Sequence, residues 1–447
     1  MSRPVVPAPR PWVYPEPEVR VLGNGLTAWL FDLPGQHVAT FDVQVPIPLT
    51  AEPARLDGVA TITLNAIDEG TLTHPNGHIA ELLEAEGASL HGSAKHYHTR
   101  LGGQAPARRL GTTLELFAEV LREPSYDDED VTHHVEARIA RFETSLASPG
   151  AVNRMAFNQR LYGAENRLGR PAGGISETLT RITPEDVRAW HRRSFAPEHA
   201  TFILACDLSR ISDDVLSPLA QWHNPQPQLP HHADPTGLGS GLVIVDRPDA
   251  VQSSITVGVA SVPRRDPRWA AARLAGHAMA GAFASRLNLE LRERLGYTYG
   301  IHGGFGAGPT HSLFTVGGST RSEVTTDAVL RILDALRLED SFGAAEIEDA
   351  QRFLIGVAPL ATETSADIVD QAAELCAAGH TTAFLKEHFQ ALAAVEPEES
   401  TRVFRELVSP ENLVVAITGQ AERLVPELEA AGLNPSVLNP GQRLSSM

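Results

Sequence analysis

One stretch decides the fold of this chain, Ser285-Arg-Leu-Asn-Leu-Glu-Leu-Arg-Glu-Arg-Leu-Gly-Tyr-Thr-Tyr-Gly300, which joins a helical segment to a strand. The residues from Trp269 to Arg294 favour a helix because Ala, Leu, Arg and Glu dominate among them. Leu287 and Leu291 lie four positions apart and so share one face of that helix. The pattern therefore predicts one long helix over 269–294.

Gly296 is expected to end this helix, because a glycine directly after the last periodic residue is the usual C-terminal stop. Residues 297–300 are expected to continue as extended chain. The turn then places Arg292, on the last helical turn, close to Tyr299, at the start of a strand, so that a guanidinium and a phenol are available to one ligand. The alternative interpretation of such a pair is a surface charge and a core aromatic.

The longer stretch Gly281-Ala-Phe-Ala-Ser-Arg-Leu-Asn-Leu-Glu-Leu-Arg-Glu-Arg-Leu-Gly-Tyr-Thr-Tyr-Gly300 resembles the signature of the C-terminal half of the pitrilysin/insulinase-type zinc peptidases, the inverzincins. In that family an Arg and a Tyr seven residues apart hold the substrate near the scissile bond, and Arg292 and Tyr299 have this spacing (299 − 292). The resemblance extends from about Val19 to Leu424. It implies an α+β clam-shell, in which two similar α/β halves face each other across a cavity.

Composition and charge narrow the possible partners. The chain has 447 residues, too many for one ordinary core, so two domains are expected. Its 37 basic and 55 acidic side chains give a net charge of −18, which disfavours nucleic acid and anionic membrane as partners. No apolar run reaches the ~20 residues needed to cross a bilayer, and the proline-rich N-terminus lacks the apolar stretch of a signal peptide. The expected location is the cytoplasm.

Cysteine supports no disulfide framework or cysteine-based zinc site. The two cysteines, Cys206 and Cys376, lie far apart in the sequence and in different predicted halves. Both are expected to be small core residues.

The first half is predicted to follow an extended arm at residues 1–18 and to occupy residues 19–222. An Asn24-Gly25 turn between alternating apolar residues indicates a hairpin. Thr183 and Pro184 have the residue types of an N-cap and a first helical position. Helices are expected at 58–70, 78–86, 112–122, 127–144 and from 183, with strands at 38–46 and 201–207 and a strand pair between 89 and 102.

The second half is predicted at 241–447, after a proline-rich linker at 223–240 that could not form a core. Strands are expected from 241 and at 252–261. Residues 182–207 and 395–419 share the order helix, then Pro-Glu with His or Asn, then strand, at nearly the same spacing. This repeat indicates a duplicated α/β unit, with sheets covered by helices.

If the second half carries the substrate-holding pair, the resemblance implies that the first half should carry the family's zinc helix, His-x-x-Glu-His in the frame Gly-x-Ala-His-x-x-Glu-His-x-x-x-x-Gly-Thr. The frame is present as Gly58-Val-Ala-Thr-Ile-Thr-Leu-Asn-Ala-Ile-Asp-Glu-Gly-Thr71, but its three working positions hold Thr61, Leu64 and Asn65. A hydroxyl and a neutral amide are poor zinc ligands, and leucine cannot act as a base. We therefore expect no metal at these degenerate positions.

Other candidate ligands offer no complete site. Glu143 lies near the position of the family's third ligand, and its alternative interpretation is an ordinary carboxylate on a helix surface. His96 and His98 are predicted to share one face of a strand, with His91 nearby. Adjacent histidines also occur at 133–134 and 231–232, but no carboxylate accompanies any of these at metalloprotease spacing. Surface or hydrogen-bonded histidines are the expected interpretation.

The resemblance implies a non-catalytic, substrate-binding subunit of a heterodimeric zinc metallopeptidase. Arg292 and Tyr299 would bind a substrate carbonyl, while a homologous partner with an intact His-x-x-Glu-His supplies the zinc. The chain alone would carry no cofactor and would not be a peptidase, and a homodimer of the isolated chain remains open.

Three further interpretations remain open. The glycine-rich stretch 300–308 would either let a peptide backbone approach closely or form a flexible hairpin tip. The chain could instead be a catalytically silent scaffold or peptide-binding subunit, for which the Arg/Tyr pair would have no use. A self-sufficient peptidase would require stoichiometric zinc and cleavage by the isolated chain.

Overall fold

Two six-stranded sheets organise the chain in the computed structural model, which describes residues 13–224 and 237–438. The first sheet has the strand order β1-β2-β6-β3-β5-β4. Strands β2 and β6 run parallel, and the other neighbours run antiparallel. Its strands are β1 (Glu18–Val21), β2 (Thr27–Asp32), β3 (Val38–Val45), β4 (Ser89–Ala94), β5 (Thr99–Pro106) and β6 (Thr201–Cys206).

The second sheet has the order β12-β7-β11-β8-β10-β9. Strand β7 runs parallel to both β11 and β12, and the remaining pairs are antiparallel. Its strands are β7 (Gly241–Asp246), β8 (Gln252–Ser261), β9 (Ile301–Phe305), β10 (Ser312–Arg321), β11 (Val414–Gly419) and β12 (Pro435–Leu438).

Helices cover both sheets. Those of the first half are α1 (Val59–Asn65), α2 (His78–Ala85), α3 (Leu110–Arg122), α4 (Asp128–Ser145), α5 (Pro149–Tyr162), α6 (Ser176–Leu179), α7 (Pro184–Ser194) and α8 (Ser217–Ala220). Those of the second half are α9 (Trp269–Gly276), α10 (Arg286–Asn288), α11 (Thr325–Arg337), α12 (Ala344–Gly356), α13 (Ser365–Ala377), α14 (Ala383–Ala394), α15 (Pro397–Leu407) and α16 (Ala421–Ala430).

The two halves repeat one topology, which confirms the α+β fold of two similar halves. The order β2-β6-β3-β5-β4 in the first sheet corresponds to β7-β11-β8-β10-β9 in the second. In each half a proline-initiated helix, α7 or α15, precedes the central parallel strand, β6 or β11. Thr183 caps α7 by accepting a hydrogen bond from the backbone N–H of Asp186, as its residue type predicted.

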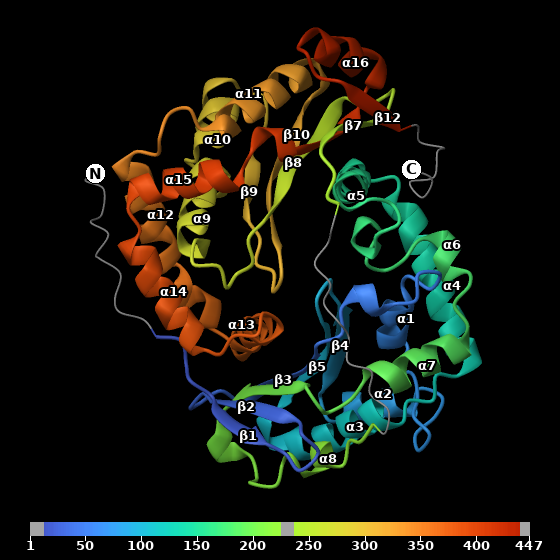
Figure 1. The fold of residues 1–447 in the computed structure, drawn as a ribbon. Coiled ribbons are helices and arrows are strands. Elements are labelled where there is room, and N and C mark those ends of the chain that lie inside the picture. The colour runs from blue at the N-terminus through green and yellow to red at the C-terminus, as the bar shows by residue number, and fades with distance from the viewer. Residues whose placement is uncertain (1–12, 225–236, 439–447) are drawn as a thin grey trace, which may run out of the picture.

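The halves exchange one helix each (Figure 1). Helix α5 of the first half packs on the second sheet, where Phe157 lies among Val243, Val245 and Ala416. Helix α13 of the second half packs in turn on the first sheet, against side chains of β2 and β6. Each sheet is thereby covered on both faces, which explains why β6 and β11 are buried along nearly their whole length.

Polar contacts also cross between the halves, and two of them come from the loop between β4 and β5. Lys95 pairs with Glu374 of α13 at 2.6 Å. The hydroxyl of Tyr97 lies 3.2 Å from Nε2 of His311, in the loop between β9 and β10. The tips of these two hairpins therefore meet at the junction of the halves.

The prediction of one long helix over 269–294 is wrong. Helix α9 ends at Gly276 and passes into a wide π-helical turn, His277–Gly281, and a second helical segment runs from Arg286 to Arg294. Ala282 adopts an extended backbone conformation between them. Gly276 packs so closely on Phe305 of β9 that a Cβ would lie 2.8 Å from its ring. The helix formers dominated the sequence pattern, but the glycines mark where the chain leaves the helix.

Two smaller expectations also need correction. The helix expected at 58–70 ends at Asn65, and the backbone N–H of the next residue, Ala66, donates to the carbonyl of Ile62 as the last helical bond. His96 and His98 do not share a strand face, because both lie in the loop between β4 and β5. The strand pair around this loop is confirmed.

The expected arm and linker fall largely outside the described residues, at 1–12 and 225–236. Within the described part of the arm, Tyr14 is buried and its hydroxyl donates to the carbonyl oxygen of Ile368 in α13, at 2.7 Å. The arm therefore docks on the second half before β1 begins.

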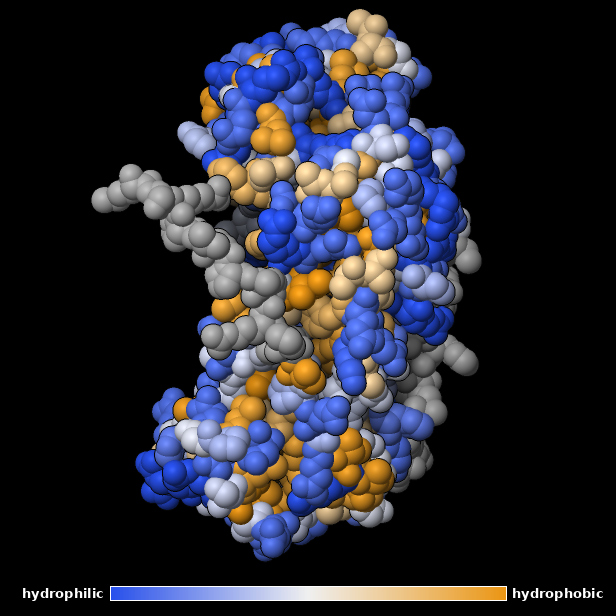
Figure 2. Space-filling view, turned by 90° about the vertical axis from the view of Figure 1, so that its left-hand side faces the viewer, coloured by the Kyte–Doolittle hydropathy of each residue, from blue (hydrophilic) through white to orange (hydrophobic). Residues whose placement is uncertain are grey.

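The outer surface differs between the halves on the side that carries α12 and α14. Hydrophilic side chains cover most of the second half there, and hydrophobic ones gather at the middle and over the first half (Figure 2).

Within the described ranges, no helix combines the length and apolar character that crossing a bilayer requires.

Candidate functional site

The segment that carries Arg292 is held against strand β9 by Asn288. Its side-chain amide donates to the carbonyl oxygen of Ile301 at 3.0 Å, and its amide oxygen accepts from the backbone N–H of Ile301 at 2.8 Å. Gly296 follows with φ +64°, and the N–H of Tyr297 bonds back to the carbonyl of Leu291 at 2.8 Å. The predicted glycine stop is confirmed, and these bonds fix how the turn leaves the helix.

Arg292 and Tyr299 keep their polar groups available. The guanidinium carbon of Arg292 lies 3.8 Å from the ring centroid of Phe283, a cation–π contact. The Nε of Arg292 lies 3.6 Å from a carboxylate oxygen of the adjacent residue Glu293. Tyr299 is 95% exposed and lies before β9, not on a strand. The structure records no contact between Arg292 and Tyr299 among the residues it describes, so it does not test their joint use.

Neighbouring side chains of the same types are engaged within the fold. Arg294 forms an ion pair with Glu290, and the hydroxyl of Tyr297 donates to Asp327 at 2.8 Å. By contrast, Tyr299 is exposed, and the ion pair of Arg292 is the longer one to its sequence neighbour Glu293, at 3.6 Å.

Neither support of this site was predicted from the sequence, although Asn288 and Phe283 both belong to the family signature. A buried asparagine three residues after a serine N-cap carries a weak signal, but an exposed phenylalanine gives none before the arginine beside it is known from the fold.

The degenerate zinc positions lie on α1. Leu64 is buried, and its side chain packs on Gly92 of β4 so closely that a Cβ at Gly92 would lie 2.9 Å from that of Leu64. Thr61 and Asn65 are half-buried one turn apart on this helix. A hydrocarbon side chain thus fills the place where the family pattern has a carboxylate, and the donor set does not fit zinc.

Glu143 and the histidines do not complete a metal site. Glu143 is exposed on α4, where the hydroxyl of Ser176 approaches it at 3.5 Å. His134 binds Glu69 through Nε2 at 2.7 Å, while residues 231–232 lie outside the described ranges. Across residues 13–224 and 237–438, no group of three or more His, Cys, Asp or Glu side chains is arranged to hold a metal ion.

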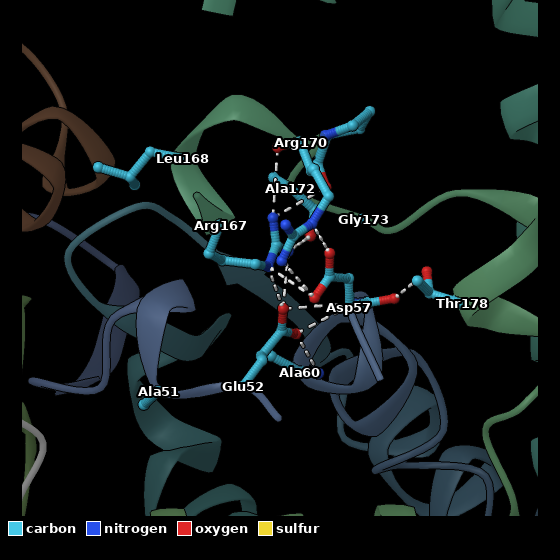
Figure 3. Close-up of polar contacts among 12 residues, drawn as sticks. Ala51, Glu52, Asp57, Ala60, Arg167, Leu168, Arg170, Ala172, Gly173 and Thr178 are labelled. Atoms are coloured by element: carbon cyan, nitrogen blue, oxygen red, sulfur yellow. Dashed lines mark hydrogen bonds and ion pairs between the residues drawn. The ribbon is translucent and has the colours of Figure 1, made fainter. Parts of the chain in front are cut away.

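A buried ionic cluster anchors the start of α1 (Figure 3). The carboxylate of Glu52 accepts from the backbone N–H groups of Gly58 and Ala60, at 3.2 and 2.9 Å. Arg167 pairs with the same carboxylate at 2.6 Å, and both side chains are almost wholly buried. Burial raises the pKa of Glu52, and the nearby Arg167 guanidinium opposes this rise.

The cluster continues through Asp57 and Arg170, which form a second ion pair beside the first. The remaining Arg167 donors reach three backbone carbonyls, of Arg170, Pro171 and Ala172. The helix that would carry zinc in the family pattern is thus fixed by charged side chains that hold no ligand.

Strand β9 ends its sheet and leaves one edge without a strand partner within the described chain. The glycine-rich stretch forms this strand. Gly303 lies so near β10 that a Cβ would meet the carbonyl of Thr315 at 2.2 Å, and Gly304 has φ +154°. At Ile301 the backbone is already bonded to Asn288, and beyond this residue the edge offers backbone donors and acceptors that an extended peptide can pair with.

Comparison with known families gives two matches to models of one family. The model described as Insulinase (Peptidase family M16) matches residues 30–171. The model described as Peptidase M16 inactive domain matches residues 181–354. Together the two matches cover more than half of the chain.

Curated relatives include two proteins named as uncharacterized zinc proteases. The one from Streptomyces coelicolor is 23% identical over 288 residues, which are 63% of this chain and 62% of the relative. The one from Mycobacterium bovis is 26% identical over 299 residues, which are 64% of this chain and 66% of the relative. The chain therefore spans somewhat less than two thirds of the length of these relatives.

Solved structures share the fold over nearly the whole chain. A peptidase M16 inactive domain from Pseudomonas fluorescens superposes with a TM-score of 0.83 at 22% identity, covering 90% of this chain and 98% of that one. A chain of Complex III2 from Candida albicans superposes with a TM-score of 0.77 at 14% identity, covering 94% of this chain and all of that one. At these identities the likeness extends to the fold alone.

Proposed function

This chain belongs to peptidase family M16, the insulinase family, and from that premise we propose that it is the non-catalytic, substrate-binding subunit of a heterodimeric zinc peptidase. A homologous partner with an intact zinc motif would supply the metal and the attacking water. This chain would supply Arg292 and Tyr299. One observation carries the proposal: Tyr299 is exposed and Arg292 is half-buried with its guanidinium on Phe283, while a buried leucine, Leu64, occupies the position of the family's catalytic carboxylate.

The proposed role of the pair is to hold a substrate carbonyl. Arg292 offers several N–H donors in a rigid fork, and Tyr299 offers one adjustable O–H donor. Donors fixed toward the carbonyl oxygen would set the peptide's register and stabilise negative charge that develops there during attack. The open edge of β9 supports this role, because it would accept the peptide as an added strand.

The test mixes this chain with a zinc-bearing homologue and measures cleavage of a peptide by the complex. Arg292→Ala and Tyr299→Phe should each lower turnover about tenfold or more, because each removes a donor to developing charge. Complex formation, measured by analytical ultracentrifugation, should be unchanged, because Tyr299 is exposed and the recorded contacts of Arg292 are with its neighbours Phe283 and Glu293.

Two matched variants serve as controls. Arg294→Ala removes an exposed arginine from the same segment, and Tyr297→Phe removes a hydroxyl bound to Asp327, so both should leave turnover near normal. Normal turnover in both Arg292→Ala and Tyr299→Phe would contradict the proposal.

A second candidate is a scaffold or peptide-binding subunit without a part in turnover. The fold shared with a chain of Complex III2 favours this alternative, although that likeness is one of fold. If the chain is a scaffold, the cleavage rate of the complex should not change in the same experiment when Arg292 or Tyr299 is replaced. A zinc-free isolated chain that cleaved peptides would contradict both candidates.

A further inference from the structure

Arg264, in the loop between β8 and α9, is a buried arginine without a carboxylate partner. It is 8% exposed, and three arginines of the described chain are buried to this degree. The other two are paired, Arg100 with Asp42 at 2.6 Å and Arg167 with Glu52 at 2.6 Å. Because a buried charge is costly unless it is paired, the absence of a partner for Arg264 requires an explanation.

Among the described residues, the polar atoms of the Arg264 side chain have no recorded protein acceptor. Its Nε is enclosed and makes no hydrogen bond. Its terminal nitrogens are not enclosed, and no hydrogen bond from them is recorded within the described ranges. The guanidinium lies over the ring of Phe384 in α14, 5.0 Å from the ring centroid, so one face of it is packed and its edge remains open.

A second guanidinium, that of Arg273 in α9, lies in the same cluster. Its Nη1 donates to Nε2 of His388 at 3.2 Å. His388 is 5% exposed, and burial and the two arginines lower its pKa to about 3, so its ring is neutral at pH 7 and can accept this bond. Arg273 has no ion pair among the described residues, and its positive charge helps burial to lower the pKa of Arg264 to about 10.

The remaining groups around the two arginines do not neutralise them. The ring of His380 stacks on Phe384 at 4.0 Å, and its buried Nε2 has no hydrogen-bond partner. Glu374 is the acidic group that favours the charged form of Arg264, but its carboxylate is bound by Lys95 at 2.6 Å. The guanidiniums of Arg264 and Arg273 therefore lie in one cluster and keep N–H donors unused. The net charge of the chain as a whole is strongly negative.

We propose that Arg264 and Arg273 form a binding site for a carboxylate group. A carboxylate is planar and accepts through two oxygens, which match the paired N–H donors along one edge of a guanidinium. The terminal nitrogens of Arg264 offer such an edge, because its Nε is enclosed. The carboxylate could belong to a small organic acid or to the C-terminus of a peptide.

The site lies at the junction of the two halves, apart from the Arg/Tyr signature. The backbone N–H of Arg264 donates to the carbonyl of Gly308, in the hairpin loop whose His311 contacts Tyr97 of the first half. A bound carboxylate would therefore tie α9 and α14 together beside this junction. The inference goes beyond the proposed function, because it requires neither a partner subunit nor zinc.

The test measures dissociation constants of four probes for the isolated full-length chain by isothermal titration calorimetry at constant ionic strength. The probes are acetate, N-acetyl-dialanine, N-acetyl-dialanine amide and inorganic phosphate. We expect the two carboxylates to bind and the amide not to bind. Equal affinity for both carboxylates would identify a small organic acid as the source, and tighter binding of N-acetyl-dialanine would identify a peptide C-terminus.

Arg264→Gln and Arg273→Gln should each weaken carboxylate binding about tenfold or more, because each removes a charge-assisted bond. Arg265→Gln is the matched control, because Arg265 is the exposed neighbour of Arg264. This variant should bind carboxylates as tightly as the unaltered chain does. Replacement of Arg264 should also leave the thermal midpoint without ligand equal or higher, because it removes a like-charge repulsion.

If Arg264→Gln does not fold, the half-buried Arg273→Gln variant decides the result. The proposal is overturned if neither carboxylate binds, if the amide binds as tightly as the acid, or if phosphate binds more tightly than either carboxylate. Unchanged carboxylate binding by Arg273→Gln would overturn it as well.

Discussion

Phe283 is the residue on which the orientation of Arg292 depends. An exposed arginine samples many rotamers, and ordering its side chain costs free energy when a ligand binds. The ring of Phe283, which is 68% exposed, packs against the guanidinium at 3.8 Å and so limits this freedom before a ligand arrives. The exposed aromatic group is thus explained by the arginine beside it.

Phe283→Ala should therefore weaken the proposed substrate contact without unfolding the chain. A cation–π contact at an exposed site contributes about 0.5–1 kcal/mol, so we expect turnover by the complex with a zinc-bearing partner to fall about two- to fivefold. Phe283→Tyr keeps a ring under the guanidinium and should retain normal turnover. A steady-state peptide assay compares the two, and equal rates for the Ala and Tyr variants would show that the ring has no such role.

His191 makes the stability of the first half dependent on pH. Its ring stacks on Phe195 at 4.9 Å and meets Tyr126 edge-on, and its buried Nε2 has no hydrogen-bond partner. Burial lowers its pKa from 6.5 to about 4. Because the unfolded chain takes up the proton at a higher pH than the folded chain, His191 stabilises the fold above pH 6.5, and this stability is lost as the pH falls toward 4.

At pH 5 the unfolding free energy should be about 2 kcal/mol lower than at pH 7 because of His191 alone, since each pKa unit corresponds to about 1.4 kcal/mol. His191→Phe removes the titrating group and keeps a ring against Phe195. Urea unfolding at both pH values should show a smaller drop in unfolding free energy for the variant by roughly that amount. The same drop in both proteins would assign the pH dependence to other groups.

At the scale of elements, α1 shows how a helix can keep its place after its chemistry is replaced. Its start is held by Glu52, whose carboxylate binds the first backbone N–H groups and also Arg167. Its middle is held by Leu64 against β4. The helix therefore needs no metal to be fixed in the first half.

Arg167→Met should destabilise the chain by about 3–5 kcal/mol, because it leaves the buried Glu52 carboxylate without its charged partner. Chemical denaturation measures this loss. Arg181→Met is the control, since Arg181 pairs with Glu177 on the surface and should change stability by less than about 0.5 kcal/mol.

Adding Glu52→Gln to Arg167→Met should recover part of the loss, because a neutral amide oxygen can still accept from Gly58 and Ala60 without an unpaired charge. A double variant as unstable as the single one would show that the ion pair is not the source of the effect.

The elements were predictable from sequence where one local signal dominated. The Asn24-Gly25 hairpin and the Thr183 cap formed as expected, because their residue types fix the local backbone. The break in the helix over 269–294 was not predictable in this way, because helix-forming residues continue through Ala282, where the backbone becomes extended. The cluster around Arg167 was missed because its members come together only in the fold.

The site was predictable where a family signature identified it and not where packing creates it. The signature pointed to Arg292 and Tyr299, whose exposure the structure then described. It contained no sign of the two unpaired arginines, because an arginine without a carboxylate can be recognised only when its neighbours are known.

At the scale of the whole molecule, the exchange of α5 and α13 makes each half incomplete without the other. Helix α5 covers one face of the second sheet with a buried layer that includes Val152, Phe157 and Leu161. Without it, Val243 and Val245 of β7 would meet water on that face. Since burial of such apolar side chains contributes about 1.5–3 kcal/mol each, the second half should not form a stable sheet alone.

A fragment that begins at Gly237 and ends at Met447 should therefore lack a cooperative thermal transition and bind a hydrophobic dye, because it contains α13 without its sheet and the second sheet without α5. Adding a separate fragment of residues 1–224, which carries α5, should restore both the transition and a dye-free surface through reassembly of the exchanged helices. Phe157→Asp in that first fragment places a charge in the α5 layer and should prevent the rescue, whereas Arg154→Asp, at an exposed position of the same helix, should permit it. Differential scanning calorimetry of the mixtures distinguishes the outcomes, and a cooperative transition in the second fragment alone would show that the halves fold independently.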